Sequence, residues 1–253
     1  MSSLSGHSKW SSIKHKKAKK DAQKGKLFSK LARKITIEAK QGGGDIDKNP
    51  ALRMAVEKAQ EAGMPKENIT KAIKRGTGEL PGVSYEQITC EGYGPGGVAL
   101  LIEAVTDNKR RVISEIRHIL TSNGGHMGET GCVSWLFERK GSVVFDKRNI
   151  DEDKIMELAI EIGAEDIKED ENTMEIIFPP EEFGKVKEKI KEAGLKPDLL
   201  ELTMVPQTVV PLEEKEAIQM LKLMDALEEM EEVQNVYANF DIPEEIMEKA
   251  SSK

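Results

Sequence analysis

The chain has 253 residues, of which 38% are hydrophobic and 33% are charged, and its formal net charge is −7 at pH 7. This composition excludes fibrous and collagen-like proteins, and no apolar run approaches the roughly 18 to 20 residues that a membrane-spanning helix needs. The length favours two or three domains. No apolar segment of about 7 to 15 residues follows the basic N-terminus, so we expect a cytoplasmic protein without a secretory signal and without a membrane partner.

The charge is distributed unevenly along the chain. Residues 1–80 hold 19 Lys and Arg against 8 Asp and Glu, a net charge of +11, whereas residues 81–253 carry −18. A basic module joined to an acidic body predicts a polyanionic partner for the first part and leaves the acidic part for a possible protein partner.

Cys90 and Cys132 are too few for a disulfide framework or a zinc site, so we expect both to be small buried residues.

The first 80 residues have the pattern of three short amphipathic helices. Apolar residues recur every four positions over residues 21–40, with basic residues on the other side. Asn49 and Pro50 offer an N-cap and a first-turn proline for a second helix that ends at Ala62. Pro65 starts a third helix, for which Gly76 is the expected C-terminal cap. These helices predict a small bundle.

The pattern changes after a Gly- and Pro-rich joint. We expect strands at residues 85–91 and 98–106 around the turn GYGPGG, a helix at 109–122, and a hairpin of strands 133–137 and 143–145. GYGPGG resembles a phosphate-binding loop only superficially, because it leads into a strand rather than a helix. A wide hairpin turn is the preferred interpretation, and a loop that contacts a partner is the alternative.

The order of elements from Ser142 onward is β-α-β-β-α-β, which is typical of a ferredoxin-like domain. The helix and strand that follow, at 212–230 and 233–240, lack partners nearby in sequence, whereas residues 85–122 form an incomplete unit that needs them. We therefore predict an α+β multidomain fold, with a helical bundle followed by two α/β-sandwich-like domains. The expected boundaries are 1–80 for the bundle, 81–133 with 207–253 for the middle domain, and 134–206 for a ferredoxin-like domain inserted into it.

The candidate binding surface is the positive charge that runs from a Lys-rich arm at residues 6–26 onto the outer faces of the first and third helices. Lysine and arginine held against phosphates release counterions and give salt-sensitive affinity, and the excess of lysine favours backbone contacts over base reading. Trp10 could stack on a base or fill a gap against the bundle, and a merely solvated tail is the alternative for the whole arm. The predicted nucleic-acid-binding residues are Lys9, Trp10, Lys14, His15, Lys16, Lys17, Lys19, Lys20, Lys24, Lys26, Lys30, Arg33, Lys34, Lys71, Lys74 and Arg75.

The sequence presents no recognisable catalytic set, metal site or cofactor motif. His7 and His15 lack clustered carboxylates or thiols, so they are expected to contact phosphate or base rather than a metal. His118 and His126 flank the end of a predicted helix without an evident nucleophile and orienting acid. A nuclease that uses clustered carboxylates and a metal is the enzyme alternative to a non-enzymatic protein.

Several long stretches occur in one order between about residues 6 and 141: GHSKWSSIKH, NPALRMAVEKA, MPKENITKAIKRGTGEL, CEGYGPGGVAL, TDNKRRVISEIRH and GGHMGETGCVSWLFERKG. In these stretches the chain resembles the YebC/PmpR family of probable transcriptional regulatory proteins, which has mitochondrial relatives that act as translational activators of cytochrome c oxidase. The resemblance implies three domains, with the third inserted into the second, and nucleic-acid binding by the arm and bundle. We therefore expect a DNA-binding regulator of transcription, with an RNA-binding translation factor on ribosomal RNA as the alternative.

Overall fold

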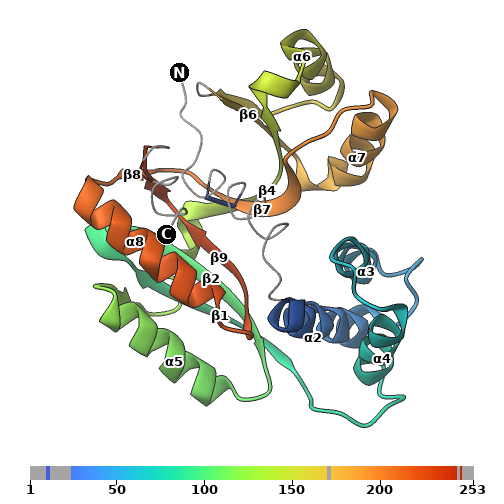
Figure 1. The fold of residues 1–253 in the computed structure, drawn as a ribbon. Coiled ribbons are helices and arrows are strands. Elements are labelled where there is room, and N and C mark those ends of the chain that lie inside the picture. Colours follow the sequence, from blue (N-terminus) through green and yellow to red (C-terminus); the bar gives the residue numbers. More distant parts are fainter. Residues whose placement is uncertain (1–9, 12–23, 170–171, 244–245, 247–253) are drawn as a thin grey trace.

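The computed structural model describes residues 10–11, 24–169, 172–243 and 246 (Figure 1). The chain forms a helical bundle and two mixed units of helices and sheet, so the predicted multidomain α+β class is confirmed. None of the helices in the described ranges combines the length and apolar character that a bilayer crossing requires.

The N-terminal bundle consists of α2 (Lys24–Gly42), α3 (Pro50–Glu61) and α4 (Lys66–Gly76). The Asn49 side chain caps α3 by accepting a hydrogen bond from the Leu52 amide at 3.1 Å. The predicted helices are thus confirmed, although α2 ends two residues later than expected and residues 21–23, where the first helix was expected to begin, lie outside the described part. The apolar side chains that recur on each helix meet in one core, which contains Leu31, Ile35, Leu52, Val56, Ala59, Ile69 and Ala72.

Gly76 is not the cap of the third helix, and that prediction is wrong. It lies inside the last turn of α4, and Thr77 follows as the C-cap. A Cβ atom at position 76 would lie 2.4 Å from the carbonyl oxygen of Thr36 in α2. The Thr36 hydroxyl also donates a hydrogen bond to the Ala72 carbonyl at 3.1 Å. Gly76 is therefore required by the close approach of two helices rather than by a left-handed turn.

The middle unit is a four-stranded sheet in the order β3-β1-β2-β9. Strands β1 (Glu86–Tyr93) and β2 (Ala99–Thr106) form the predicted antiparallel hairpin across a turn at Pro95–Gly97. The later strand β9 (Val233–Ala238) pairs antiparallel with β2, and β3 (His126–Met127) is a short edge strand that the sequence pattern did not indicate.

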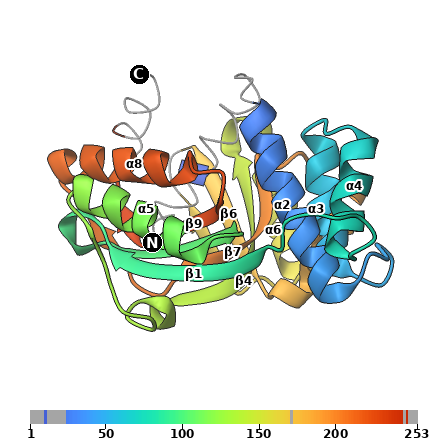
Figure 2. The same ribbon diagram turned by 90° about the horizontal axis from the view of Figure 1, so that it is seen from below.

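Two helices cover one face of this sheet, α5 (Lys109–Ser122) and α8 (Glu214–Glu228), as Figure 2 shows. Their apolar faces share one core with β1, β2 and β9. Two short parallel strands, β8 (Val210–Pro211) and β10 (Phe240–Asp241), flank the entry to α8 and the end of β9. Segments from both halves of the chain are therefore needed to close this core.

The second mixed unit has the strand order β5-β6-β4-β7, with every neighbouring pair antiparallel. Its chain order is the expected ferredoxin-like β-α-β-β-α-β. The elements are β4 (Phe137–Asp146), α6 (Glu152–Glu161), β5 (Asp166–Glu169), β6 (Thr173–Phe178), α7 (Phe183–Glu192) and β7 (Leu199–Pro206). The chain enters this unit after β3 and leaves it before β8, while the residue boundaries of the domains, 81–133 with 207–253 and 134–206, remain predictions.

The predicted hairpin at 133–137 and 143–145 is wrong. A single strand, β4, runs through the RKG sequence and pairs with β6 on one side and β7 on the other. Gly141 lies in the middle of β4, where an added Cβ atom would fall 2.0 Å from the Phe178 ring. The glycine makes room for an aromatic ring across the strands rather than for a turn. Residues Ser134–Leu136 form a 3-10 turn that precedes the strand.

Candidate nucleic-acid interface

One exposed basic face of the bundle lies on α4. Lys71, Lys74 and Arg75 are exposed, whereas Ile69 and Ala72 point from the other side of the helix into the bundle core. Lys74 and Arg75 occupy the last turn, where the helix dipole stabilises positive charge. Lys71 shares its charge with Glu67 on the same exposed face, at 2.6 Å. These three predicted residues form a rigid, solvent-facing positive surface.

Lys30 and Arg33 on the basic side of α2 face the rest of the protein, so the expectation of an outward face is wrong for these two residues. Arg33 lies 3.2 Å from Glu231 and 3.4 Å from Glu232, and its guanidinium lies over the Tyr85 ring at 5.9 Å. Lys30 donates a hydrogen bond to the Glu228 carbonyl oxygen. The acidic turn at residues 228–232, at the end of α8, thus contacts the cations that were expected to bind phosphates.

Two further predicted cations of α2, Lys34 and Lys26, differ from each other. Lys34 forms an ion pair with Glu38 one turn later, at 2.7 Å, while Lys26 is exposed. The reason for the wrong expectation is that α2 is covered on two sides. One side packs in the bundle, and the other lies beside β2 and β9, as the views agree (Figures 1 and 2).

Glu232 joins the bundle to the middle unit. It is 8% exposed and accepts a hydrogen bond from Arg111 of α5 at 2.6 Å, in addition to its contact with Arg33. Burial alone would raise the pKa of the Glu232 carboxyl, but the hydrogen bond from Arg111 and the charges of Arg33 and Arg111 hold that pKa below its usual value. The carboxylate therefore stays ionised and links two arginines that belong to different units.

Trp10 is a structural residue, and its assignment to the binding surface is corrected. Its side chain is 1% exposed and belongs to the core of the middle unit, with Ile102, Leu223 and Phe240. An indole in that position cannot reach a base without leaving the core. The alternative interpretation, that Trp10 fills a gap, names the right kind of role but the wrong site, because the bundle has its own separate core.

The rest of the predicted arm lies outside the described residues, and its role stays a prediction. This applies to Lys9, Lys14, His15, Lys16, Lys17, Lys19 and Lys20, and also to His7. Lys24 is the first residue of α2.

Sequence reasoning missed the organising role of Glu91 at the end of β1. Its buried carboxylate accepts hydrogen bonds from the amides of Gly131 and Val133, both at 2.7 Å, and of Ser134 at 2.8 Å. Burial opposes ionisation, but these amides keep the pKa of Glu91 below its usual value. The only signal in the sequence is an acidic residue inside a strand that precedes a Gly-rich loop.

The two predicted buried cysteines differ. Cys90 is buried as expected, whereas Cys132, in the loop that Glu91 binds, is partly exposed.

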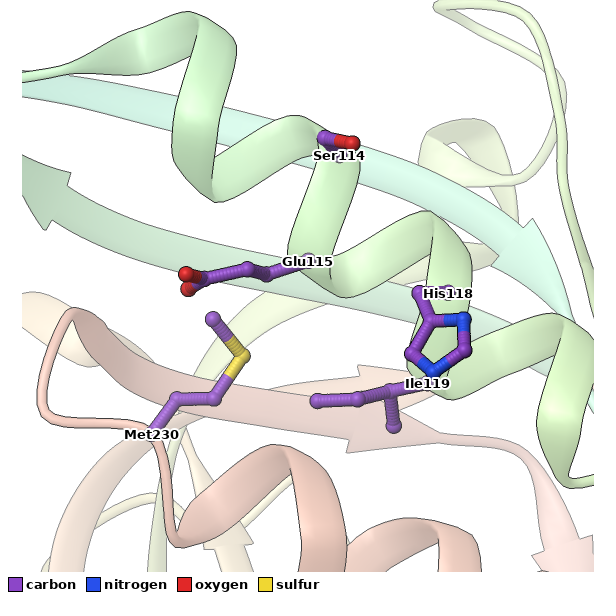
Figure 3. Close-up of a pocket in the computed structure, with 5 residues that line it drawn as sticks. All are labelled: Ser114, Glu115, His118, Ile119 and Met230. Atoms are coloured by element: carbon purple, nitrogen blue, oxygen red, sulfur yellow. The ribbon is translucent and has the colours of Figure 1, made fainter.

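A shallow pocket of about 310 Å³ lies between α5 and the acidic turn. Ser114, Glu115, His118 and Ile119 line it from α5, and Figure 3 shows the Met230 thioether extending toward them from the other side. Over the described ranges no hydrogen bond joins Ser114 to His118, and Glu115 is held by Arg111 at 3.2 Å. No cluster of three or more His, Cys, Asp or Glu suited to a metal occurs in the same ranges. The pocket thus offers no nucleophile paired with a base.

Two family models match almost the whole chain. The model described as the TACO1/YebC protein N-terminal domain matches residues 8–79, and the model of the TACO1/YebC second and third domain matches residues 85–240. The chain belongs to the TACO1/YebC family. The resemblance proposed from the sequence motifs is therefore confirmed.

Relatives in the TACO1/YebC family match along their full length. A probable transcriptional regulatory protein from Dictyoglomus turgidum is 55% identical over 249 residues, which cover 98% of this chain and 100% of the relative. A protein of the same description from Syntrophus aciditrophicus is 54% identical over 250 residues, with coverage of 98% and 100%. The crystal structure of a conserved hypothetical protein from Aquifex aeolicus is 46% identical, has a TM-score of 0.78, and matches over 88% of this chain and 92% of that chain.

Proposed function

We propose that this TACO1/YebC-family protein is a non-enzymatic regulator of transcription that binds DNA through its basic N-terminal module and acts in the cytoplasm. The observation that carries the proposal is the exposed cationic face of α4, formed by Lys71, Lys74 and Arg75 on the side opposite the bundle core. The net charge of +11 over residues 1–80 supports it, because the Lys-rich arm continues the same positive character. Relatives named probable transcriptional regulatory proteins support the regulatory role.

Binding of this kind depends on phosphates more than on bases. Lysine is a compact point charge that suits single phosphate oxygens, whereas bidentate reading of guanine is typical of arginine. Each cation placed against a phosphate releases counterions, so affinity falls steeply as the salt concentration rises. The charge of −18 on residues 81–253 repels the same polyanion. The phosphate contacts are therefore expected on the arm and the bundle rather than on the acidic units.

The test compares two triple variants of the full chain. In the first, Lys71, Lys74 and Arg75 are replaced by Gln; in the matched control, Lys154, Lys191 and Lys196 are replaced by Gln, which removes the same charge from exposed positions of the ferredoxin-like unit. Fluorescence anisotropy with a labelled 20-base-pair duplex is measured over a series of salt concentrations. The proposal predicts weaker binding for the α4 variant and a salt slope smaller by up to about 0.9 for each phosphate that the variant no longer neutralises. Equal slopes for the two variants would contradict it.

A further inference from the structure

Trp135 is an exposed aromatic ring that the phosphate contacts do not use. Its side chain is 66% exposed, whereas Trp10 is 1% exposed. The indole Nε1 donates to the Cys132 carbonyl at 3.1 Å, so the polar edge of the ring is already satisfied. We propose that Trp135 is a stacking site for an unpaired base of a nucleic acid that the basic module holds. This inference rests on the proposed function and extends it from the sugar-phosphate backbone to the bases.

The loop that carries Trp135 is held in place before any ligand arrives. Glu91 fixes the backbone at three points through the amides of Gly131, Val133 and Ser134. The Gly128 amide adds a bond to the Glu91 carbonyl at 2.9 Å. A ring that is already ordered loses little conformational entropy when a base stacks on it, so more of the stacking energy appears as affinity.

The surroundings of the loop favour a nucleic acid as the ligand. The Tyr93 hydroxyl also donates to the Cys132 carbonyl, at 3.4 Å, and the Tyr93 ring stacks on His126 with centroids 5.3 Å apart. The Arg117 guanidinium reaches Met127, the neighbour of His126. Exposed aromatic rings are the features on which proteins stack the bases of single strands, because every base has a π-face. The proposed ligand class is therefore a single-stranded segment.

The experiment uses the full chain, a 15-nucleotide oligothymidine, its uridine counterpart, and a duplex of equal length. Trp10 and Trp135 are the two tryptophans of the chain, so W135F leaves an emission that comes from Trp10 alone. Binding is followed by anisotropy of a labelled strand, and stacking by quenching of tryptophan emission with unlabelled strands. We expect single strands to quench the wild-type emission more than the duplex does, and this quenching to disappear in W135F. We also expect W135A to bind single strands about 5- to 150-fold more weakly.

The control variant is V83A, which shortens another exposed apolar side chain, 53% exposed, in the joint before β1. Wild-type affinity for single strands in V83A and a loss in W135A would support the stacking site. Binding of single strands without quenching, or equal affinity of W135A and wild type, would refute the stacking site and leave the proposed function intact. If the wild-type chain bound neither single strands nor duplex, the proposed function would fall and this inference with it.

Discussion

Arg33 of α2 and Glu231 of the acidic turn form an ion pair at 3.2 Å across the boundary between the bundle and the middle unit. The residues are 198 positions apart in the chain, so the pair is a tertiary contact rather than a local helix pairing. A cation that amphipathicity assigned to solvent is instead covered by a carboxylate of the same molecule. This ion pair lowers the positive charge that α2 can present to a polyanion.

Replacing Glu231 by Gln is expected to strengthen nucleic-acid binding, because one competitor for the Arg33 guanidinium is removed. The Glu231 side chain is 40% exposed, and exposed ion pairs are worth about 0.2–1 kcal/mol, so affinity should rise about 1.5- to 5-fold. E229Q is the matched control: it removes the same charge from an exposed position of the same turn, where no contact with Arg33 occurs. Anisotropy titrations at low salt provide the comparison, and an equal gain in both variants would show that only net charge matters.

Replacing Glu232 by Gln should lower the free energy of unfolding by about 1–3 kcal/mol at pH 7, because a buried carboxylate between two arginines loses its charge. The folded-state pKa of Glu232 is depressed, so its stabilising contribution is present above the unfolded-state pKa of about 4.3 and disappears as the pH falls through the folded-state value. Urea unfolding at pH 7 and at pH 3 should therefore show a difference between wild type and E232Q that shrinks in acid. A difference that grows in acid would contradict the ionised state assigned to Glu232.

Replacing Gly76 by Ala should destabilise the bundle by about 1–3 kcal/mol, since the new methyl group would meet the Thr36 carbonyl at 2.4 Å and force α4 away from α2. Gly25, in the first turn of α2, has no atom within 4 Å of an added Cβ, and Ala is the better helix former. G25A should accordingly leave stability unchanged or raise it by up to about 1 kcal/mol. Thermal unfolding of the two variants distinguishes close packing from a general cost of removing glycine, which would destabilise both.

Truncation of the two tryptophans should change the free energy of unfolding by very different amounts. W10A removes a ring from the core of the middle unit and should cost about 3–5 kcal/mol, whereas W135A removes an exposed ring and should change stability by less than about 0.5 kcal/mol. Urea unfolding followed by far-UV circular dichroism measures both values. A small effect of W10A would show that residues 10–11 do not contribute to this core.

Helices and strands whose apolar residues recur at regular spacing were predictable from the sequence. The apolar residues of α3 and α5, the β1–β2 hairpin and the β-α-β-β-α-β order all follow from local spacing, and the unpartnered C-terminal helix and strand indicated the insertion. What local pattern could not predict are contacts made over long distances in the chain. Lys30 and Arg33 of α2 are an example. Local spacing predicts that they face solvent, because their acidic partners at 228–232 come from another unit and cannot be seen in the spacing.

The roles of two glycines and of Trp10 could not be predicted from the sequence for the same reason, because they depend on contacts between distant parts of the chain. Gly76 and Gly141 each occur where a turn or cap was plausible, but each makes room for a group from another element, the Thr36 carbonyl or the Phe178 ring. Within the candidate site, Lys71, Lys74 and Arg75 have the exposure expected of them, while Trp10 lies in a core that only the assembled sheet creates. Burial of an aromatic residue in a basic segment depends on tertiary structure, and spacing does not reveal it.

The most direct test of the central claim is the salt dependence of DNA binding by the full chain when the arm lysines are neutralised without disturbing Trp10. Replacing Lys14, Lys16, Lys17, Lys19 and Lys20 by Gln keeps the buried indole in place, which deletion of the whole arm would not. The slope of log K against log salt is then measured for this variant and for wild type on the same duplex. We predict a steep slope for wild type and a clearly shallower one for the variant, by up to about 0.9 for each phosphate left without its lysine. Equal slopes, or a wild-type chain that ignores DNA even in dilute buffer, would contradict the account.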